Sequence, residues 1–227
     1  MTGTRCAVVR VYNEATVLAS VLRSLQPVVD EIICVDDGSS DGSAEIALAA
    51  GCTVVRHAIN LGGGAALATG LHYALTRTEH EHVVNFDADG QHLPADAAQM
   101  LEVAKRTGVD VVLGTRNRHE ATMPRSRRLL LRAALAYTRR TTGLRLTDTH
   151  NGLRVFNRHA LRSIRLTQGG MAYASELESS ISRAKLTWTE VPVSIVYNEY
   201  CLAKGQSNLN AVNIVYDLML SRLQRAT

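Results

Sequence analysis

Short apolar runs alternate along the chain with segments that have helical periodicity. The apolar runs are rich in Val and Ile, which is typical of buried strands, and they cover residues 6–11, 32–35, 53–55, 82–86 and 109–113. The helical segments between them cover residues 15–25, 44–50, 65–75 and 95–105. This alternation predicts an α/β fold with right-handed crossovers, in which helices flank a mostly parallel central sheet. Ligands of such sheets bind beyond the carboxyl ends of the strands.

Length and composition are those of one globular domain that spans residues 1–227. The chain is 46% hydrophobic and 20% charged, and it has no Pro/Gly/Ser-rich linker that would separate a second domain. It contains no apolar run of about 18 residues and no signal-peptide pattern, so we expect a cytosolic protein. Cys6, Cys34 and Cys52 lie in apolar segments without CxxC spacing, and Cys201 stands alone. Buried reduced thiols are therefore expected instead of disulfides or a zinc site.

Polar motifs follow the predicted strands directly, at residues 12–14, 36–43, 60–64, 87–92 and 114–116. In the segment DDGSSDGS (36–43), the glycines and serines indicate a strand-to-helix turn with capping side chains. Capping does not explain the two adjacent acids, Asp36 and Asp37, so a nucleotide contact is also predicted. The glycines of residues 60–64 fit either a phosphate at a helix N-terminus or close backbone packing, and both interpretations stay open.

Asp87 and Asp89 are one residue apart in the segment VVNFDADGQH (83–92). In an extended backbone both would face the same side, and Gln91 adds a third oxygen two residues further on. Hard divalent cations prefer such oxygen ligands, so the segment predicts a metal that binds a diphosphate. The alternative is that the acids only cap the helix that begins near Pro94.

Positive charge is concentrated in one part of the chain, although the formal net charge is only +4. Nine arginines and one acid, Glu120, lie between Arg116 and Arg145, which favours an anionic partner. Nucleic acid is not expected, because the only aromatic residue there is Tyr137. Residues 124–143 have the pattern of a basic amphipathic helix, which indicates either a membrane surface or an ordinary packed helix with a solvated basic face.

Taken together, the motifs resemble family 2 glycosyltransferases, and among them the dolichyl- and polyprenyl-phosphate sugar synthases. The resemblance covers roughly residues 5–195 and rests on motifs at residues 12–14, 35–42, 60–65, 87–92, 114–116, 148–154 and 190–192. It implies the GT-A fold, a Rossmann-like arrangement, with a nucleotide-sugar donor, Mg²⁺ or Mn²⁺, and inversion at the anomeric carbon.

The resemblance also implies roles for individual residues. Tyr12, Glu14, Val35 and Asp37 match the nucleoside pocket, and Ala88 matches a backbone contact to the donor. The metal and diphosphate site corresponds to Asp87, Asp89 and Gln91, and Arg116 matches the arginine near the donor phosphates. We expect Arg127 or Arg128 to bind a phosphate, and Arg154 and Lys204 to serve the acceptor or a closing loop.

The sequence departs from the family pattern at two places. Arg10 stands where the family usually has proline before its Tyr-Asn-Glu motif, and residues 197–207 replace a late basic block, in which Lys204 is a candidate substitute. Glu176 resembles a family position, but a helix N-terminal charge is the commoner role of such a residue, and the catalytic base is left unassigned.

These observations predict transfer of a sugar to polyprenyl phosphate by a protein bound peripherally to the inner face of the plasma membrane. A C-terminal helix at residues 208–224 is expected to lie on the membrane, dock against a small membrane-protein partner, or pack on the sheet. The alternatives are transfer to a hydroxyl of a lipid-linked glycan, an inactive nucleotide-sugar-binding scaffold, and a nucleotidyltransferase.

Overall fold

The computed structural model describes residues 4–116, 139–140, 142–148, 151–170 and 173–196. The strands are β1 (Arg5–Val11), β2 (Glu31–Asp36), β3 (Thr53–Arg56), β4 (His82–Asp87), β5 (Val111–Arg116), β6 (Arg154–Asn157) and β7 (Trp188–Val193). The helices are α1 (Ala15–Leu25), α2 (Ser43–Ala49), α3 (Gly63–Arg77), α4 (Pro94–Thr107), α6 (Arg158–Ser163) and α7 (Tyr173–Arg183).

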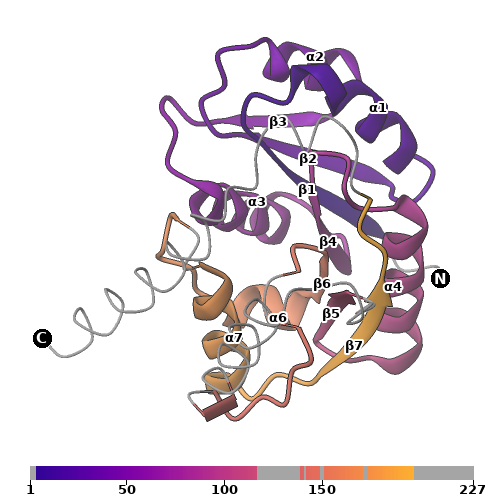
Figure 1. The fold of residues 1–227 in the computed structure, drawn as a ribbon, viewed down its shortest axis with the longest axis vertical. Helices are drawn as coiled ribbons and strands as arrows, with labels where there is room; N and C mark the ends of the chain where they lie inside the picture. Colours follow the sequence, from indigo (N-terminus) through magenta and orange to yellow (C-terminus); the bar gives the residue numbers. More distant parts are fainter. Residues whose placement is uncertain (1–3, 117–138, 141, 149–150, 171–172, 197–227) are drawn as a thin grey trace, which may run out of the picture.

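The strands form one mixed sheet in the order β3-β2-β1-β4-β6-β5-β7 (Figure 1). Strand β6 is antiparallel to β4 and β5, and the other pairs are parallel. The prediction of a mostly parallel sheet with flanking helices is therefore confirmed.

Two apolar clusters, one on each face of the sheet, make up the core. Strand β1 shows the division, because its side chains alternate between the faces. Ala7, Val9 and Val11 pack with residues of α1, α2 and α4, whereas Cys6 and Val8 pack with residues of α3, α6 and α7. Arg10 is two residues after Val8 on β1, so its side chain points to the same face as those of Cys6 and Val8, toward α3 and α7.

The predicted state of the cysteines is confirmed for the described residues. Cys6, Cys34 and Cys52 are free and buried, and Cys201 lies outside the described part of the chain. Burial, together with the negative charge of Glu31, raises the pKa of the Cys6 thiol to about 12, which makes this thiol unreactive at neutral pH.

Two strands were not expected from the sequence. Strand β6 is four residues long and begins with Arg154, so it has too little apolar periodicity to be recognised. Strand β7 pairs with β5, lies last in the sheet order and contains Pro192, which is tolerated at a sheet edge.

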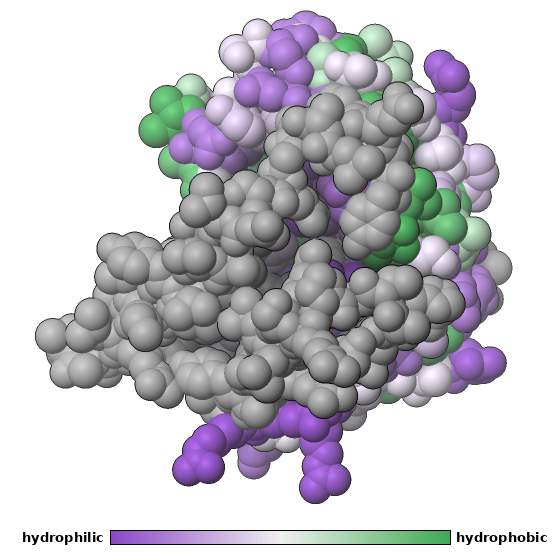
Figure 2. Space-filling model, in the orientation of Figure 1, coloured by the Kyte–Doolittle hydropathy of each residue, from purple (hydrophilic) through white to green (hydrophobic). Residues whose placement is uncertain are grey.

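The described surface mixes polar and apolar side chains. Its exposed large apolar residues include Ile59 and Leu61, on the loop between β3 and α3, where Figure 2 shows a green projection at the left edge. None of the helices in the described ranges combines the length and hydropathy that crossing a bilayer would require.

Asp110 ties the β5, β6 and β7 region together and gives a first prediction. Its carboxylate accepts hydrogen bonds from Thr187 N at 2.8 Å, Thr187 Oγ1 at 2.7 Å, Asn157 Nδ2 at 3.0 Å and His159 Nδ1 at 2.9 Å. Burial opposes the charged form, but these hydrogen bonds outweigh it and lower the pKa of Asp110. The lowered pKa means that ionised Asp110 stabilises the folded protein.

We expect Asp110→Ala to reduce the free energy of unfolding by about 1–3 kcal/mol at neutral pH, because it leaves hydrogen-bond donors without an acceptor. The contribution is complete above the ordinary aspartate pKa of about 4 and is lost as pH falls through the lower folded-state pKa. Urea titrations at pH 7 and pH 3 measure this difference. Glu102→Gln, at an exposed acid that pairs with Arg5, is the control; an equal loss in both variants would contradict the prediction.

Candidate active site

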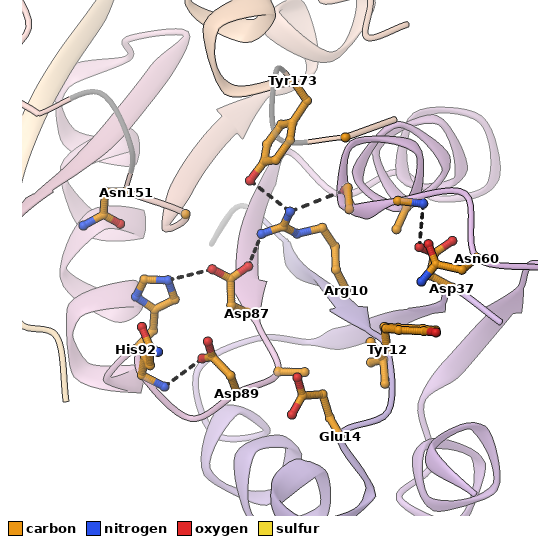
Figure 3. Close-up of a pocket in the computed structure, with 18 of the residues that line it drawn as sticks. Arg10, Tyr12, Glu14, Asp37, Asn60, Asp87, Asp89, His92, Asn151 and Tyr173 are labelled. Atoms are coloured by element: carbon orange, nitrogen blue, oxygen red, sulfur yellow. Dashed lines mark hydrogen bonds and ion pairs between the residues drawn. The ribbon is translucent and has the colours of Figure 1, made fainter. Parts of the chain in front are cut away.

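A pocket of about 480 Å³ lies beyond the carboxyl ends of the central strands, within the volume range of ligand sites. It brings together most of the residues that the sequence predicted, from segments far apart in the chain (Figure 3). The predicted residues that line it are Tyr12, Glu14, Asp37, Asp87, Ala88, Asp89, Gln91 and Arg116, together with Asn60, Gly62 and Gly63 of the glycine loop.

Val35 is not among the lining residues. Its side chain is fully buried in the apolar cluster beneath α3, where it packs close to Gly70. Its predicted contact with the nucleoside stays a prediction and would have to use the backbone.

The loop at residues 12–14 is held by the turn that follows β2. Asn13 N donates to Ser39 Oγ at 3.0 Å, and Glu14 N donates to Ser43 Oγ at 2.9 Å. Asp41 accepts from Ala15 N at 2.9 Å. The serines and Asp41 therefore cap and position this loop, which leaves Tyr12 46% exposed at the pocket.

The adjacent acids Asp36 and Asp37 have different contacts, although both are buried. Asp36 pairs with Arg56 Nε at 3.0 Å and accepts from Ser39 N at 3.2 Å. Asp37 accepts from His57 Nδ1 at 2.7 Å, Leu61 N at 2.9 Å and Gly62 N at 2.8 Å. Asp37 thus fixes the glycine loop at the edge of the pocket that it also lines.

The glycines of this loop allow two backbone segments to touch. Gly64 N donates to Gly169 O at 2.8 Å. A Cβ on Gly62 would collide with Gly169 O, and one on Gly64 with Gln168 O. Close packing, one of the two interpretations left open, is therefore observed directly; a phosphate at the N-terminus of α3 stays a prediction.

Glu176, in the first turn of α7, holds the segment that meets the glycine loop. Its carboxylate accepts from Thr167 N at 2.8 Å, Thr167 Oγ1 at 2.6 Å and Gln168 N at 3.0 Å. These contacts show that Glu176 anchors the loop that precedes α7.

Asp87 ends β4 and lies in the centre of the pocket. It forms an ion pair with Arg10, and its Oδ2 accepts from His92 Nε2 at 3.1 Å. Burial opposes ionisation, but Arg10 and His92 outweigh it and hold the pKa of Asp87 below its ordinary value. Gly152 is required here, because a Cβ at this position would collide with Asp87 Oδ2.

Asp89 lies in a turn, because the strand ends at Asp87 and Gly90 has a φ of 76°. The extended backbone assumed for this pair is therefore wrong beyond Asp87, although both carboxylates still line the pocket. Asp89 Oδ1 accepts from Gln91 N at 2.9 Å. Burial and the nearby Asp87 carboxylate raise the pKa of Asp89, so the pocket disfavours its charged form.

Charge balance is the test of whether this pocket suits a divalent cation. The carboxylates of Glu14, Asp37, Asp87 and Asp89 face two guanidinium groups, those of Arg10 and Arg116, among the described lining residues. The described residues contain no cluster of three or more His, Cys, Asp or Glu arranged as a complete metal site. An excess of carboxylates with oxygen donors at Asp89 and Gln91 nevertheless fits a cation bound partly by protein and partly by an anionic ligand.

Arg116 ends β5 and is held by Asp148. Its Nε and Nη2 each donate to the Asp148 carboxylate at 2.7 Å, and its backbone N donates at 3.1 Å. This bidentate pair fixes the plane of the guanidinium at the pocket wall.

Sequence reasoning missed three residues that line this pocket and contact one another or Asp87: Arg10, His92 and Tyr173. Arg10 stands out in the sequence only as a departure from proline. His92 lies inside the motif at residues 87–92 without a role of its own, and Tyr173 gives no signal. Arg154, predicted at the acceptor or closing loop, is buried on β6 with its guanidinium 5.8 Å from the centre of the Tyr173 ring. Arg127, Arg128 and Lys204 lie outside the described residues, as does most of the basic segment 124–143 and all of the helix expected at 208–224.

Comparison with known proteins adds a family to this geometry. Residues 6–165 match the model of glycosyl transferase family 2. The chain is 28% identical to the UDP-N-acetylglucosamine–dolichyl-phosphate N-acetylglucosaminyltransferase of Methanococcus voltae, covering 95% of each protein. It is 31% identical to the undecaprenyl-phosphate mannosyltransferase of Micrococcus luteus, covering 85% of this chain and 83% of the relative.

A solved structure has the same fold. Glucosyl-3-phosphoglycerate synthase from Mycobacterium tuberculosis, in complex with Mn²⁺, UDP and glucosyl-3-phosphoglycerate, superimposes with a TM-score of 0.69 at 23% identity, covering 96% of this chain and 79% of that one. The GT-A fold implied by the sequence motifs is therefore confirmed. By its sequence match over more than half its length, the chain belongs to glycosyl transferase family 2.

Proposed function

We propose that this protein transfers a sugar, with inversion at the anomeric carbon, from a nucleotide-diphosphate sugar to polyprenyl phosphate at the cytoplasmic face of a membrane. The observation that carries the proposal is the pocket, which gathers Tyr12, Asp37, Asp89 and Arg116 at the carboxyl ends of the strands. The two relatives described above are named for transfer to dolichyl and undecaprenyl phosphate, which supports this acceptor class.

The donor part of the proposal rests on shape and charge. Tyr12 offers an aromatic surface to a base, and the carboxylates of Glu14 and Asp37 are acceptors for base or ribose donors. Arg116 is oriented by Asp148 toward the pocket, where it would bind a phosphate oxygen. The predicted roles of these residues stay part of the proposal.

The metal part rests on the excess of carboxylates. A diphosphate brings more negative charge beside described lining residues that already include four carboxylates and two guanidinium groups, so a bound cation would favour its binding. Asp89 and Gln91, with Asp87, would hold Mg²⁺ or Mn²⁺, which would stabilise the charge that develops on the leaving diphosphate. Mn²⁺ accompanies UDP in the similar Mycobacterium tuberculosis structure, which supports the same class of ion.

The chemistry of the acceptor agrees with the role of Glu176. A hydroxyl acceptor needs a base that removes its proton, whereas a phosphate acceptor is already ionised. Because Glu176 accepts three hydrogen bonds from the loop at residues 167–168, it is poorly suited to act as that base. A phosphate acceptor would need no such base, so the role of Glu176 is compatible with polyprenyl phosphate.

The test uses purified protein, UDP- and GDP-sugars labelled in the sugar, and polyprenyl phosphate in anionic vesicles. We expect a labelled lipid product with Mg²⁺ or Mn²⁺ and none with EDTA. Product formed only with a lipid-linked glycan would favour the hydroxyl acceptor. Binding of nucleotide sugar without transfer would favour the inactive scaffold, and formation of nucleotide sugar would favour a nucleotidyltransferase.

The peripheral location is tested in the same vesicles. The basic segment 124–143 would attract an anionic leaflet by about 1 kcal/mol for each arginine near the surface. Replacing Arg127, Arg128 and Arg132 with Gln should then weaken salt-sensitive sedimentation with vesicles and reduce lipid transfer more than donor hydrolysis. Equal loss of both activities would place these arginines in the donor site, and a dependence on added membrane extract would point to the small membrane-protein partner.

A further inference from the structure

Arg10 is a buried cation inside the acidic part of the pocket. It lies opposite Asp87 in the register of β1 and β4, and its side chain is only 14% exposed. Its Nη2 donates to Asp87 Oδ1, while its Nη1 donates to Tyr173 Oη at 2.9 Å and Gly63 O at 3.4 Å. Figure 3 shows the guanidinium between Asp87, Tyr173 and the start of α3.

The Arg10 guanidinium is placed where it can bind an anion. Arg10 Nε is buried and has no hydrogen-bond partner among the described residues, so the guanidinium has a donor available to a ligand. Gly63, which Arg10 contacts, begins the 15-residue helix α3, and the partial positive charge of a helix N-terminus favours an anion at the same place. The Tyr173 ring, whose centre is 5.1 Å from the guanidinium carbon, supports the side chain from the α7 side.

Asp87 holds this cation through an ion pair. The Asp87 carboxylate is shared between Arg10 on one oxygen and His92 on the other. A divalent cation and a guanidinium bound to the same carboxylate repel each other, so a metal ion that binds Asp87 competes with Arg10. If a metal ion displaces Arg10 from Asp87, the guanidinium charge stays in the pocket without that carboxylate. A diphosphate bound in the same pocket would then be a suitable partner for Arg10.

We propose that Arg10 is a diphosphate-binding residue that pairs with Asp87 in the donor-free protein and contacts the diphosphate once a divalent cation takes Asp87. This inference rests on the proposed function, because it assigns a residue to the donor that the function requires. Arg10 and the metal ion then divide the neutralisation of the diphosphate between them.

The decisive experiment is a double-mutant cycle on Arg10 and Asp87, with UDP and GDP as probes and isothermal titration in EDTA. Asp87→Asn releases Arg10 and should increase the affinity for the preferred nucleoside diphosphate without metal. Adding Arg10→Gln to Asp87→Asn should reduce that affinity by about 10- to 100-fold, because a charge-assisted hydrogen bond is lost. Affinity for uridine or guanosine, which have no phosphate, should not change.

The double variant also protects the experiment against loss of folding. It replaces an ion pair with two amides, so no buried charge is left without its partner, in contrast to Arg10→Gln alone. Asp89→Asn is the matched control for Asp87→Asn, because it removes one charge from the same pocket but not a partner of Arg10. Arg5→Gln, at the other end of β1, controls for the loss of an arginine.

A second readout is the affinity of nucleotide-free protein for Mn²⁺, measured by electron paramagnetic resonance. Arg10→Lys keeps the positive charge but loses the planar set of donors, so the lysine should pair less well with Asp87 than Arg10 does. This variant should therefore bind Mn²⁺ more tightly than the wild-type protein. Two results together would overturn the inference and make Arg10 a structural residue. The first is that the Arg10 variants lose affinity for the nucleoside as much as for the nucleoside diphosphate. The second is that Asp87→Asn increases the affinity for the diphosphate no more than Asp89→Asn does. If no nucleoside diphosphate binds wild-type protein even with Mn²⁺, the proposed function itself fails.

Discussion

Asp89→Asn is expected to reduce sugar transfer by about 100-fold or more without destabilising the protein. The substitution removes a carboxylate at nearly constant volume, and loss of a metal ligand or of its support commonly costs this much activity. Because burial and Asp87 raise the pKa of Asp89, its charge disfavours the folded state at neutral pH. The melting temperature of the metal-free variant should therefore equal or exceed that of the wild type.

Initial rates over a range of Mn²⁺ concentrations, together with melting curves, measure both effects. Asp96→Asn is the control, because Asp96 lies in the first turn of α4 and accepts from Ser194 N outside the pocket. Full activity of Asp89→Asn in the presence of EDTA would remove the metal from the proposed mechanism. A large fall in melting temperature would instead make Asp89 a turn-capping residue.

Asp37→Ala should weaken nucleotide binding and stability together. The substitution leaves the partly buried hydrogen-bond donors of Leu61, Gly62 and His57 without their charged acceptor, so we expect the free energy of unfolding to fall by about 3 kcal/mol. Affinity for free UDP or GDP and for the nucleotide sugar should fall as well, because the glycine loop at the pocket edge loses its support.

Titrations at a temperature where the variant is folded separate the two effects, and Asp36→Ala provides a matched control. Asp36 is adjacent and equally buried, but its partners are Arg56 and Ser39 instead of the loop, and it does not line the pocket. We expect Asp36→Ala to lose stability while nucleotide affinity is retained. If Asp37→Ala behaves in the same way, the contact of Asp37 with the nucleotide is wrong and only its capping role remains.

The first half of the chain could be predicted from its sequence because its signals are local. Strands β1 to β5 and helices α1 to α4 follow from the alternation of apolar runs with helical periodicity, although the observed elements extend by one or more residues at several ends. The positions of Tyr12, Asp37, Asp87 and Asp89 after strands also follow, since parallel strands bring their carboxyl ends to one edge. Local spacing could not show that the chain turns directly after Asp87, so that Asp89 does not continue the extended backbone.

The contacts that define the site were decided by the tertiary structure. Arg10 and Asp87 are 77 residues apart in the sequence, and Asp37 meets the backbone of Gly62 across 25 residues. Strand β6 inserts between β4 and β5 in the antiparallel direction, which brings Gly152 against Asp87. By itself the sequence determined the alternation of elements and the chemistry at the strand ends, because backbone periodicity and turn propensity act between near neighbours. Only the tertiary structure decided that Asp87 pairs with Arg10, because that contact depends on the register of two strands and on the packing of α3 and α7 against them.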